Sequence, residues 1–139
     1  MMRAYRVALL LAVIPVSLAA QEPEPEFAKH LFPPELVMQN QKGLRLTPEQ
    51  RTSITQGVRD FQLRVVELQW KMQDEAEKLN ELVQETKVDS AATIAQVDRV
   101  LDVERQIKRA HMGLLIRIKN TLTPAQQDTL AVMRPGKRD

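Results

Sequence analysis

The sequence has 139 residues, of which 20 are Lys or Arg and 18 are Asp or Glu, with two histidines and no cysteine. The absence of cysteine excludes disulfides, Cys-based zinc or iron–sulfur sites and thiol catalysis, and two histidines are too few for a multi-histidine metalloenzyme. Aromatic residues make up only 4% of the chain and glycine contributes 4 residues, a composition that favours long helices over a many-stranded β domain.

The first 19 residues have the layout of a secretory signal peptide. Arg3 and Arg6 give a positive start, Val7–Val16 is an unbroken apolar run, and Ser17 and Ala19 are small residues that suit a signal peptidase. A retained membrane anchor is the alternative interpretation of this segment. The apolar run is shorter than the roughly 20 residues that cross a bilayer, so we expect cleavage, export to a periplasm and no remaining transmembrane span. Cleavage removes both arginines and leaves 18 basic and 18 acidic residues, so the formal charge of +2 does not indicate nucleic-acid binding.

Three further segments follow the predicted signal peptide. Residues 20–31 are acidic and rich in proline, as in the sequence QEPEPE at 21–26, and we expect a flexible lead-in. A helical domain is predicted over 32–134, and residues 135–139 form a tail.

The domain is predicted to begin with a short helix near 34–42. Pro34 suits the first turn of a helix and Gly43 suits a helix end. Val37 and Met38 are expected among the apolar contacts of this helix.

A strong helix start follows at the first of two LTPxQ motifs, which consists of Leu46, Thr47, Pro48 and Gln50. Thr47 is the predicted N-cap, Pro48 takes the first helical position, and Gln50 completes a capping box. The helix is expected to run to about Glu85, with an apolar seam at three- and four-residue spacing. The predicted seam consists of Ile54, Val58, Phe61, Val65, Leu68, Met72, Ala76, Leu79 and Val83. Gly57 lies within this helix and indicates a close approach to a neighbour.

A second long helix is predicted from a cap at Asp89 or Ser90 to about Thr121. Its apolar seam runs from Val97 to Ile118, with Leu101 beside it. The motif then returns as Leu122, Thr123, Pro124 and Gln126. A short helix to about Met133 is expected after it.

This order of elements predicts the shape of the domain. A tight turn near 86–89 makes the long helices an antiparallel hairpin, so both motifs lie at the same end. At 1.5 Å per residue the long helices measure roughly 50–55 Å. The short helices then fold back near the motif end as hooks.

Two LTxxQ motifs flanking a long helical hairpin resemble the Spy/CpxP family of periplasmic stress proteins, which includes CnrX/ZraP-like heavy-metal-resistance proteins. The resemblance covers about 32–133 and includes the pair His111-Met112 ahead of the second motif. It implies an all-α, four-helix hooked hairpin that is usually an antiparallel dimer. It also implies one of three roles: ATP-independent chaperone, inhibitor of an envelope sensor kinase, or metal-responsive sensor. The implied partners are a second copy, unfolded periplasmic proteins or an envelope sensor protein.

His30 and His111 are the candidate metal ligands, and the candidate ions are Cu, Zn, Ni and Co. The metal-sensing branch resembles sites with a His or Met one turn from each histidine. In this chain Leu115 follows His111 by four residues and Pro34 follows His30 by four. We therefore expect no required cofactor, and a transition metal stays an alternative.

Leu63, Val66 and Trp70 follow helical spacing on the side opposite the predicted seam. An exposed apolar stripe of this kind is typical of a partner surface. A dimer interface, a surface for unfolded clients or a sensor, and packing against the hooks are three interpretations of it. The LTPxQ residues themselves are interpreted as capping groups, with direct partner contact as the alternative.

No enzyme is predicted, because no Ser or Thr has a plausible His partner and the carboxylates are spread along helix surfaces. We predict a periplasmic stress-response or heavy-metal-resistance protein of the Spy/CpxP type that acts by binding. One alternative is a metal sensor or metal-binding protein that uses His111 and His30. A second is a structural dimer module at the membrane surface, suggested by the basic amphipathic stretch 107–122.

Overall fold

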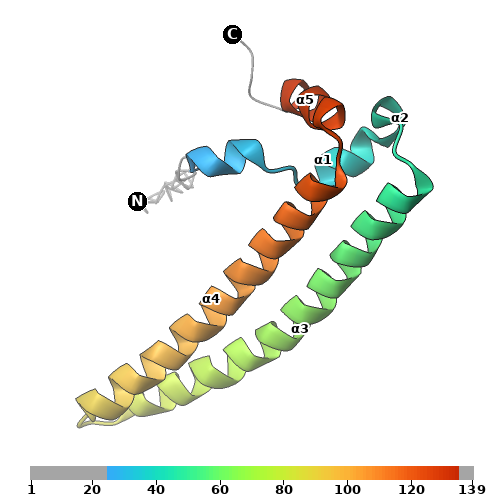
Figure 1. Ribbon diagram of the computed structural model, residues 1–139. Helices are drawn as coiled ribbons and strands as arrows, with labels where there is room; N and C mark the ends of the chain where they lie inside the picture. The colour runs from blue at the N-terminus through green and yellow to red at the C-terminus, as the bar shows by residue number, and fades with distance from the viewer. Residues whose placement is uncertain (1–24, 135–139) are drawn as a thin grey trace, which may run out of the picture.

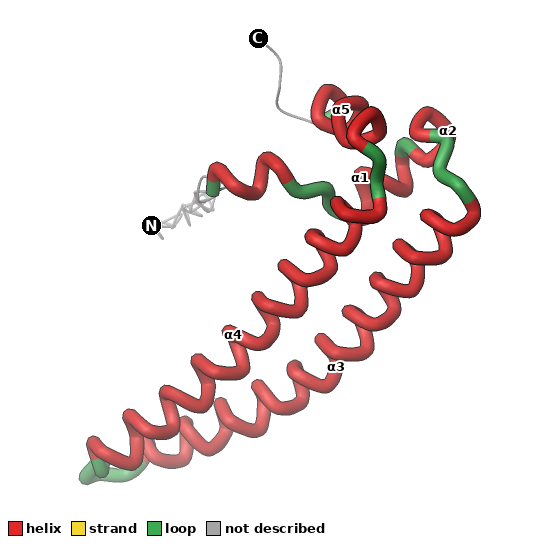
Figure 2. The backbone as a smooth tube through the Cα atoms, in the orientation of Figure 1, coloured by secondary structure: helices red, strands yellow, loops and turns green. Residues whose placement is uncertain are grey.

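The computed structural model describes residues 25–134, and this part of the chain is all-α (Figures 1 and 2). The elements in chain order are the 3-10 helix η1 (Glu26–His30), α1 (Pro34–Gln39), α2 (Gln41–Leu44), α3 (Pro48–Gln84), α4 (Ser90–Thr121) and α5 (Pro124–Met133). The predicted signal peptide and tail lie outside the described residues. Among the helices of 25–134, none is long and apolar enough to cross a membrane.

The two long helices pack side by side as the predicted antiparallel hairpin (Figure 1). Helix α3 has 37 residues and α4 has 32, which corresponds to roughly 55 and 48 Å. The turn between them covers residues 85–89, and the Asp89 carboxylate caps α4 by accepting a hydrogen bond of 3.0 Å from the Ala92 N–H. The predicted bounds of both long helices therefore agree with the structure to within one residue.

The predicted seam of α3 is correct in its first two thirds and wrong near the turn. Ala76 and Val83 are exposed, whereas Glu75 and Leu82 are half-buried in their place. The inward positions of α3 recur every seven residues, at 54, 61, 68, 75 and 82. A seven-residue repeat keeps two helices in contact only if they wind around each other, because a straight helix drifts by about 20° per heptad. The predicted seam assumed the period of a straight helix, so near the turn it selected residues that do not face α4.

Gly57 confirms the predicted close approach between the long helices. It is buried, and a Cβ at this position would lie 3.1 Å from Arg117 Cδ and 3.3 Å from Leu114 Cδ1. The missing side chain lets α4 come close to α3 near the motif end.

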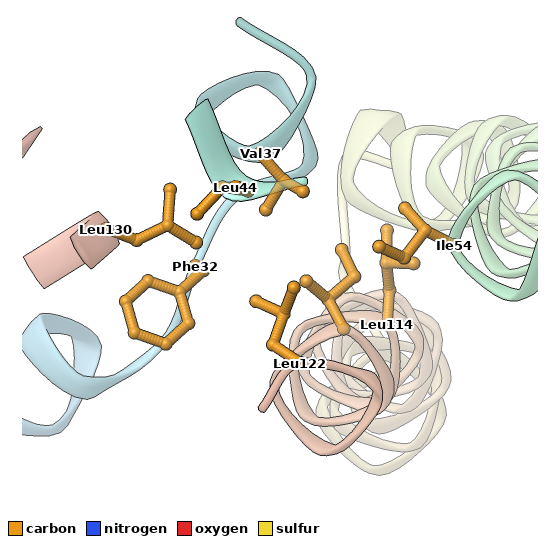
Figure 3. Close-up of a cluster of buried hydrophobic side chains, with 8 residues drawn as sticks. Phe32, Val37, Leu44, Ile54, Leu114, Leu122 and Leu130 are labelled. Atoms are coloured by element: carbon orange, nitrogen blue, oxygen red, sulfur yellow. The ribbon is translucent and has the colours of Figure 1, made fainter. Parts of the chain in front are cut away.

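The short helices form two hooks over the open end of the hairpin. We call α1 and α2 the first hook and α5 the second hook. They close a core cluster of Phe32, Val37, Leu44, Ile54, Leu114, Ile118, Leu122 and Leu130. Figure 3 shows Leu130 of the second hook, Phe32 and residues of the first hook directed toward the same centre as the side chains of α4. The core is thus concentrated at the motif end.

The first hook differs from the single helix predicted over 34–42. It consists of two short helices that meet at Asn40, and Gly43 lies inside the second. The left-handed residue after α2 is Arg45, with a φ of 51°, so Gly43 is not the helix end. The extra turn brings Leu44 into the core, whereas Met38, predicted to pack, is 60% exposed.

Part of the predicted lead-in has regular structure. Residues 26–30 form the 3-10 helix η1, within which Lys29 Nζ lies 2.6 Å from Glu26 Oε2.

Candidate functional site

Both LTPxQ motifs form complete capping boxes, as predicted. The Thr47 hydroxyl accepts a hydrogen bond of 3.1 Å from the Gln50 N–H, and Gln50 Oε1 accepts one of 3.0 Å from the Thr47 N–H. Thr123 and Gln126 repeat the arrangement at 3.3 and 2.9 Å. Pro48 and Pro124 occupy the first helical positions of α3 and α5, where a missing N–H has no consequence. Both motif leucines face inward, Leu122 fully buried and Leu46 partly.

The two motif glutamines also bind each other, a contact that the capping interpretation missed. Gln50 Nε2 donates to Gln126 Oε1 at 2.8 Å, and Gln126 Nε2 donates to Gln50 Oε1 at 3.1 Å. The remaining N–H groups donate to the carbonyl of Thr121 at 2.9 Å and to that of Leu44 at 3.0 Å. Each amide therefore makes two donor and two acceptor contacts, which is its full capacity. We call this contact the Gln50–Gln126 pair.

The pair joins the start of α3 to the start of the second hook. The sequence did contain a signal for it, since the same glutamine recurs in two motifs that lie at one end of a hairpin. The sequence alone did not give the distance between the glutamines of the two motifs. The motif end is therefore held by a satisfied polar link beside an apolar core.

The predicted stripe is exposed on α3. Leu63 is 70%, Val66 51% and Trp70 66% exposed, on the side of the helix roughly opposite the buried Leu68. The three positions are spaced by three and four residues and form a continuous apolar line on a rigid element. An exposed line of large apolar side chains is typical of a surface that binds a partner.

The outside of α4 has two exposed apolar residues one heptad apart, Ile94 and Leu101, and a separate one, Ile116, which the sequence analysis missed. Leu101 was placed beside the seam, but it is turned away from α3. Its seven-residue distance from Ile94 was the available signal, because residues seven apart share a helix face.

The structure places the two histidines in different surroundings. His111 is exposed, and its ring centroid lies 5.7 Å from that of Phe61 with the two rings tilted by 38°, in a groove that Glu35 and Lys108 also line. His30 is absent from that groove, and its carbonyl accepts a hydrogen bond of 2.7 Å from Lys119 Nζ. Lys119 lies eight residues beyond His111, roughly 12 Å along α4. Among residues 25–134 there is no group of three or more His, Asp or Glu able to hold a metal ion.

The electrostatics of the carboxylates is that of a solvated helix surface. A hydrogen bond from Gln96, followed by the contact with Lys78, holds the pKa of Glu75 below its usual range. Hydrogen bonds from Arg105 and then Gln106 lower the pKa of Asp102 in the same way. General acid catalysis at neutral pH needs a carboxyl pKa that is raised, the opposite direction.

Residues 7–129 match a family model described as heavy-metal resistance. The match spans both motifs and the whole helical hairpin. The chain belongs to the heavy-metal resistance family. The resemblance to Spy/CpxP- and CnrX-like proteins is thereby confirmed. No curated protein and no solved structure matches the chain. Proteins of the heavy-metal resistance family are generally non-catalytic and periplasmic, and no enzyme family is indicated.

Proposed function

We propose that this heavy-metal resistance family protein works in the periplasm by binding unfolded polypeptide. It acts there as an ATP-independent chaperone or as a modulator of the envelope stress response. The observation that carries the proposal is the exposed line of Leu63, Val66 and Trp70. Unfolded chains expose apolar side chains that folded proteins bury, and burying them against this line removes apolar surface from water on both partners.

Charged groups near the line favour the same class of partner. Arg59 precedes Leu63 by one turn and Lys71 follows Trp70 directly, and both are exposed. Cations beside an apolar line attract chains that carry acidic residues and speed the encounter more than they strengthen the complex.

Suppression of aggregation tests the proposal directly. The purified protein should keep a chemically denatured client in solution at stoichiometric ratio. A variant with Leu63→Ser, Val66→Ser and Trp70→Ser should lose most of this effect. The matched control replaces three exposed apolar residues elsewhere, Ile94→Ser, Leu101→Ser and Val132→Ser. If the control loses as much as the α3 variant, or the wild type suppresses nothing, the proposal is wrong.

A homodimer is the alternative occupant of the same line. Sedimentation of the wild type against the α3 variant separates the two interpretations. A dimer that becomes a monomer in the variant, while aggregation is still suppressed, assigns the line to the dimer interface and not to clients. An unchanged oligomeric state with lost suppression assigns it to clients.

Metal sensing or binding is the second candidate function, and membership of the heavy-metal resistance family is the observation that favours it. The ligands would be His111 and His30, each supplying an imidazole to Cu, Zn, Ni or Co. Calorimetric titration with each ion should then give heat that His111→Ala abolishes. A titration without heat for all four ions contradicts this second function and leaves the chaperone proposal untouched.

A further inference from the structure

A groove of about 350 Å³ lies between the first hook and α3, and neither the histidines nor Gln50 and Gln126 are among its lining residues. Its apolar lining comes from both elements and consists of Val37, Met38, Leu46, Ile54 and Val58. Val37 and Ile54 are buried members of the core, so the floor of the groove is fixed by the fold. Small-molecule sites in proteins are mostly apolar hollows of about 300–1,000 Å³, and the groove falls at the lower end of that range.

Two arginines line the same groove. Arg51 and Arg59 are exposed residues of α3, eight positions apart, with Thr55 between them in the lining. A spacing of eight residues corresponds to roughly 12 Å along the helix, and both side chains line the groove, one on each side of Thr55 in the sequence. No carboxylate is among the residues that line the groove.

The charges of these two arginines are uncompensated within residues 25–134. In that part of the chain neither makes an ion pair or a side-chain hydrogen bond. Arg99 and Arg109 of α4 share this property, whereas Arg64, Arg105 and Arg117 pair with a carboxylate. What sets Arg51 and Arg59 apart is that both line one groove that has no carboxylate in its lining. A guanidinium presents a planar fork of donors that matches a carboxylate in two parallel hydrogen bonds. Two such forks beside an apolar floor complement a ligand with one anionic end and one apolar end.

We propose that the groove binds a single-chain amphiphile with a carboxylate head, the chemical class of free fatty acids. The head lies between Arg51 and Arg59, and the alkyl chain lies on the floor against Val58. An alkyl chain carries no polar group that burial would leave without a partner. A peptide in the same place would have to satisfy its own N–H and C=O groups. The backbone of α3 is already hydrogen-bonded within the helix, and Gln41, Thr55 and Gln62 are the uncharged polar side chains that the described lining offers.

Calorimetry with decanoate, below the concentration at which it forms micelles, tests the proposal. The wild type should bind decanoate, and should bind decanol and decyltrimethylammonium about tenfold more weakly or worse, because neither offers the arginines an anion. The variant Arg51→Gln with Arg59→Gln should lose about tenfold in affinity or more. The control Arg105→Gln with Arg109→Gln removes the same charge from the outside of α4 and should bind as the wild type does.

A second variant keeps the charges and fills the groove. Thr55→Phe replaces an exposed residue of α3, leaves the core untouched and should block decanoate. Equal binding of decanoate and decanol, or full binding by the Thr55→Phe variant, overturns the proposal. So does the absence of decanoate binding, including the case in which an acidic, apolar peptide binds instead. The two proposals share Arg59, but their failures are distinguishable, because Thr55→Phe and the comparison of decanoate with decanol test the groove without changing Leu63, Val66, Trp70 or Arg59.

Discussion

The two ends of the hairpin are built differently. At the motif end, buried apolar residues of the hooks and of both long helices surround one centre (Figure 3). The Gln50–Gln126 pair links two helix starts at the same end. Toward the turn, the large apolar residues Val83, Val88 and Ile94 are exposed, and Gln96 is the buried residue closest to the turn. Apolar burial is the main favourable term in folding, so it stabilises the hairpin more at the motif end than at the turn end.

The buried residue nearest the turn makes a polar contact, beside the half-buried Leu79 and Leu82 of α3. Gln96 is 5% exposed and donates from Nε2 to the carbonyl oxygen of Glu75 at 2.8 Å and to Glu75 Oε2 at 2.7 Å. Lys78 lies 3.2 Å from the other carboxylate oxygen of Glu75. A net contribution of about 1 kcal/mol per hydrogen bond is small beside a buried core. The contacts beside the hooks therefore contribute most of the stability. The outer faces of the long helices α3 and α4 are left exposed.

The largest expected effect comes from removing core volume at the motif end. Leu130→Ala should lower the free energy of unfolding by about 2–5 kcal/mol, because Leu130 is fully buried and its loss leaves a cavity. Leu82→Ala, at a half-buried site near the turn, should cost less than half as much. Urea denaturation followed by circular dichroism measures both. If Leu130→Ala does not fold, Ile118→Val, which removes one methylene at a fully buried site, provides the comparison at about 0.5–1.5 kcal/mol. Equal losses at the two ends would contradict the comparison.

The next effect tests the Gln50–Gln126 pair. Gln126→Ala should cost about 1–3 kcal/mol, because the Gln50 amide and the Leu44 carbonyl lose their partner. Gln56→Ala, an exposed glutamine bonded to Asp60 on α3, is the matched control and should be nearly neutral. A double-mutant cycle with Gln50→Ala should give a coupling energy of about 0.5–3 kcal/mol. Strictly additive losses would mean that the glutamines act only as separate caps.

The sequence was sufficient for the architecture because its signals were local. The starts of α3, α4 and α5 are each determined by residues within one turn of chain. Thr47 and Gln50 cap α3, Asp89 caps α4, and Thr123 and Gln126 cap α5. The bounds of the long helices, the hairpin and the exposure of Leu63, Val66 and Trp70 all follow from such short-range patterns.

The features that the sequence did not reveal depend on distances between segments. The winding of α3 around α4 moves Glu75 and Leu82 into the contact, and a period read along one helix does not contain the path of the other. The left-handed turn at Arg45 and the contact between Gln50 and Gln126 are likewise set by where the first hook meets the core. The groove that Arg51 and Arg59 line forms only where the first hook packs beside α3.

A smaller effect is expected at the turn end. Gln96→Ala should cost about 1 kcal/mol or less and should act locally. Amide hydrogen exchange followed by mass spectrometry should show faster exchange in the last turns of α3 and the first turns of α4. The amides around Leu114 and Ile118 should exchange as in the wild type, since local opening spares well-packed regions. Faster exchange along the whole hairpin would show that the ends are coupled and that the two-part description is wrong.

The smallest expected effect is the pH dependence of the stability that the contact between Gln96 and Glu75 provides. The pKa of Glu75 is lowered in the folded protein, first by the hydrogen bond from Gln96 and then by Lys78. A lowered folded-state pKa means that the stabilisation is present above the unfolded-state value of about 4.3 and is lost as the pH falls through the folded-state pKa. Glu75→Gln should therefore flatten the fall in unfolding free energy between about pH 5 and 3. Glu77→Gln removes an exposed carboxylate two residues away that makes no ion pair within residues 25–134, and it should leave the profile as in the wild type. A profile that changes with Glu77 and not with Glu75 would assign the acid sensitivity to net charge instead of to the contacts of Glu75 with Gln96 and Lys78.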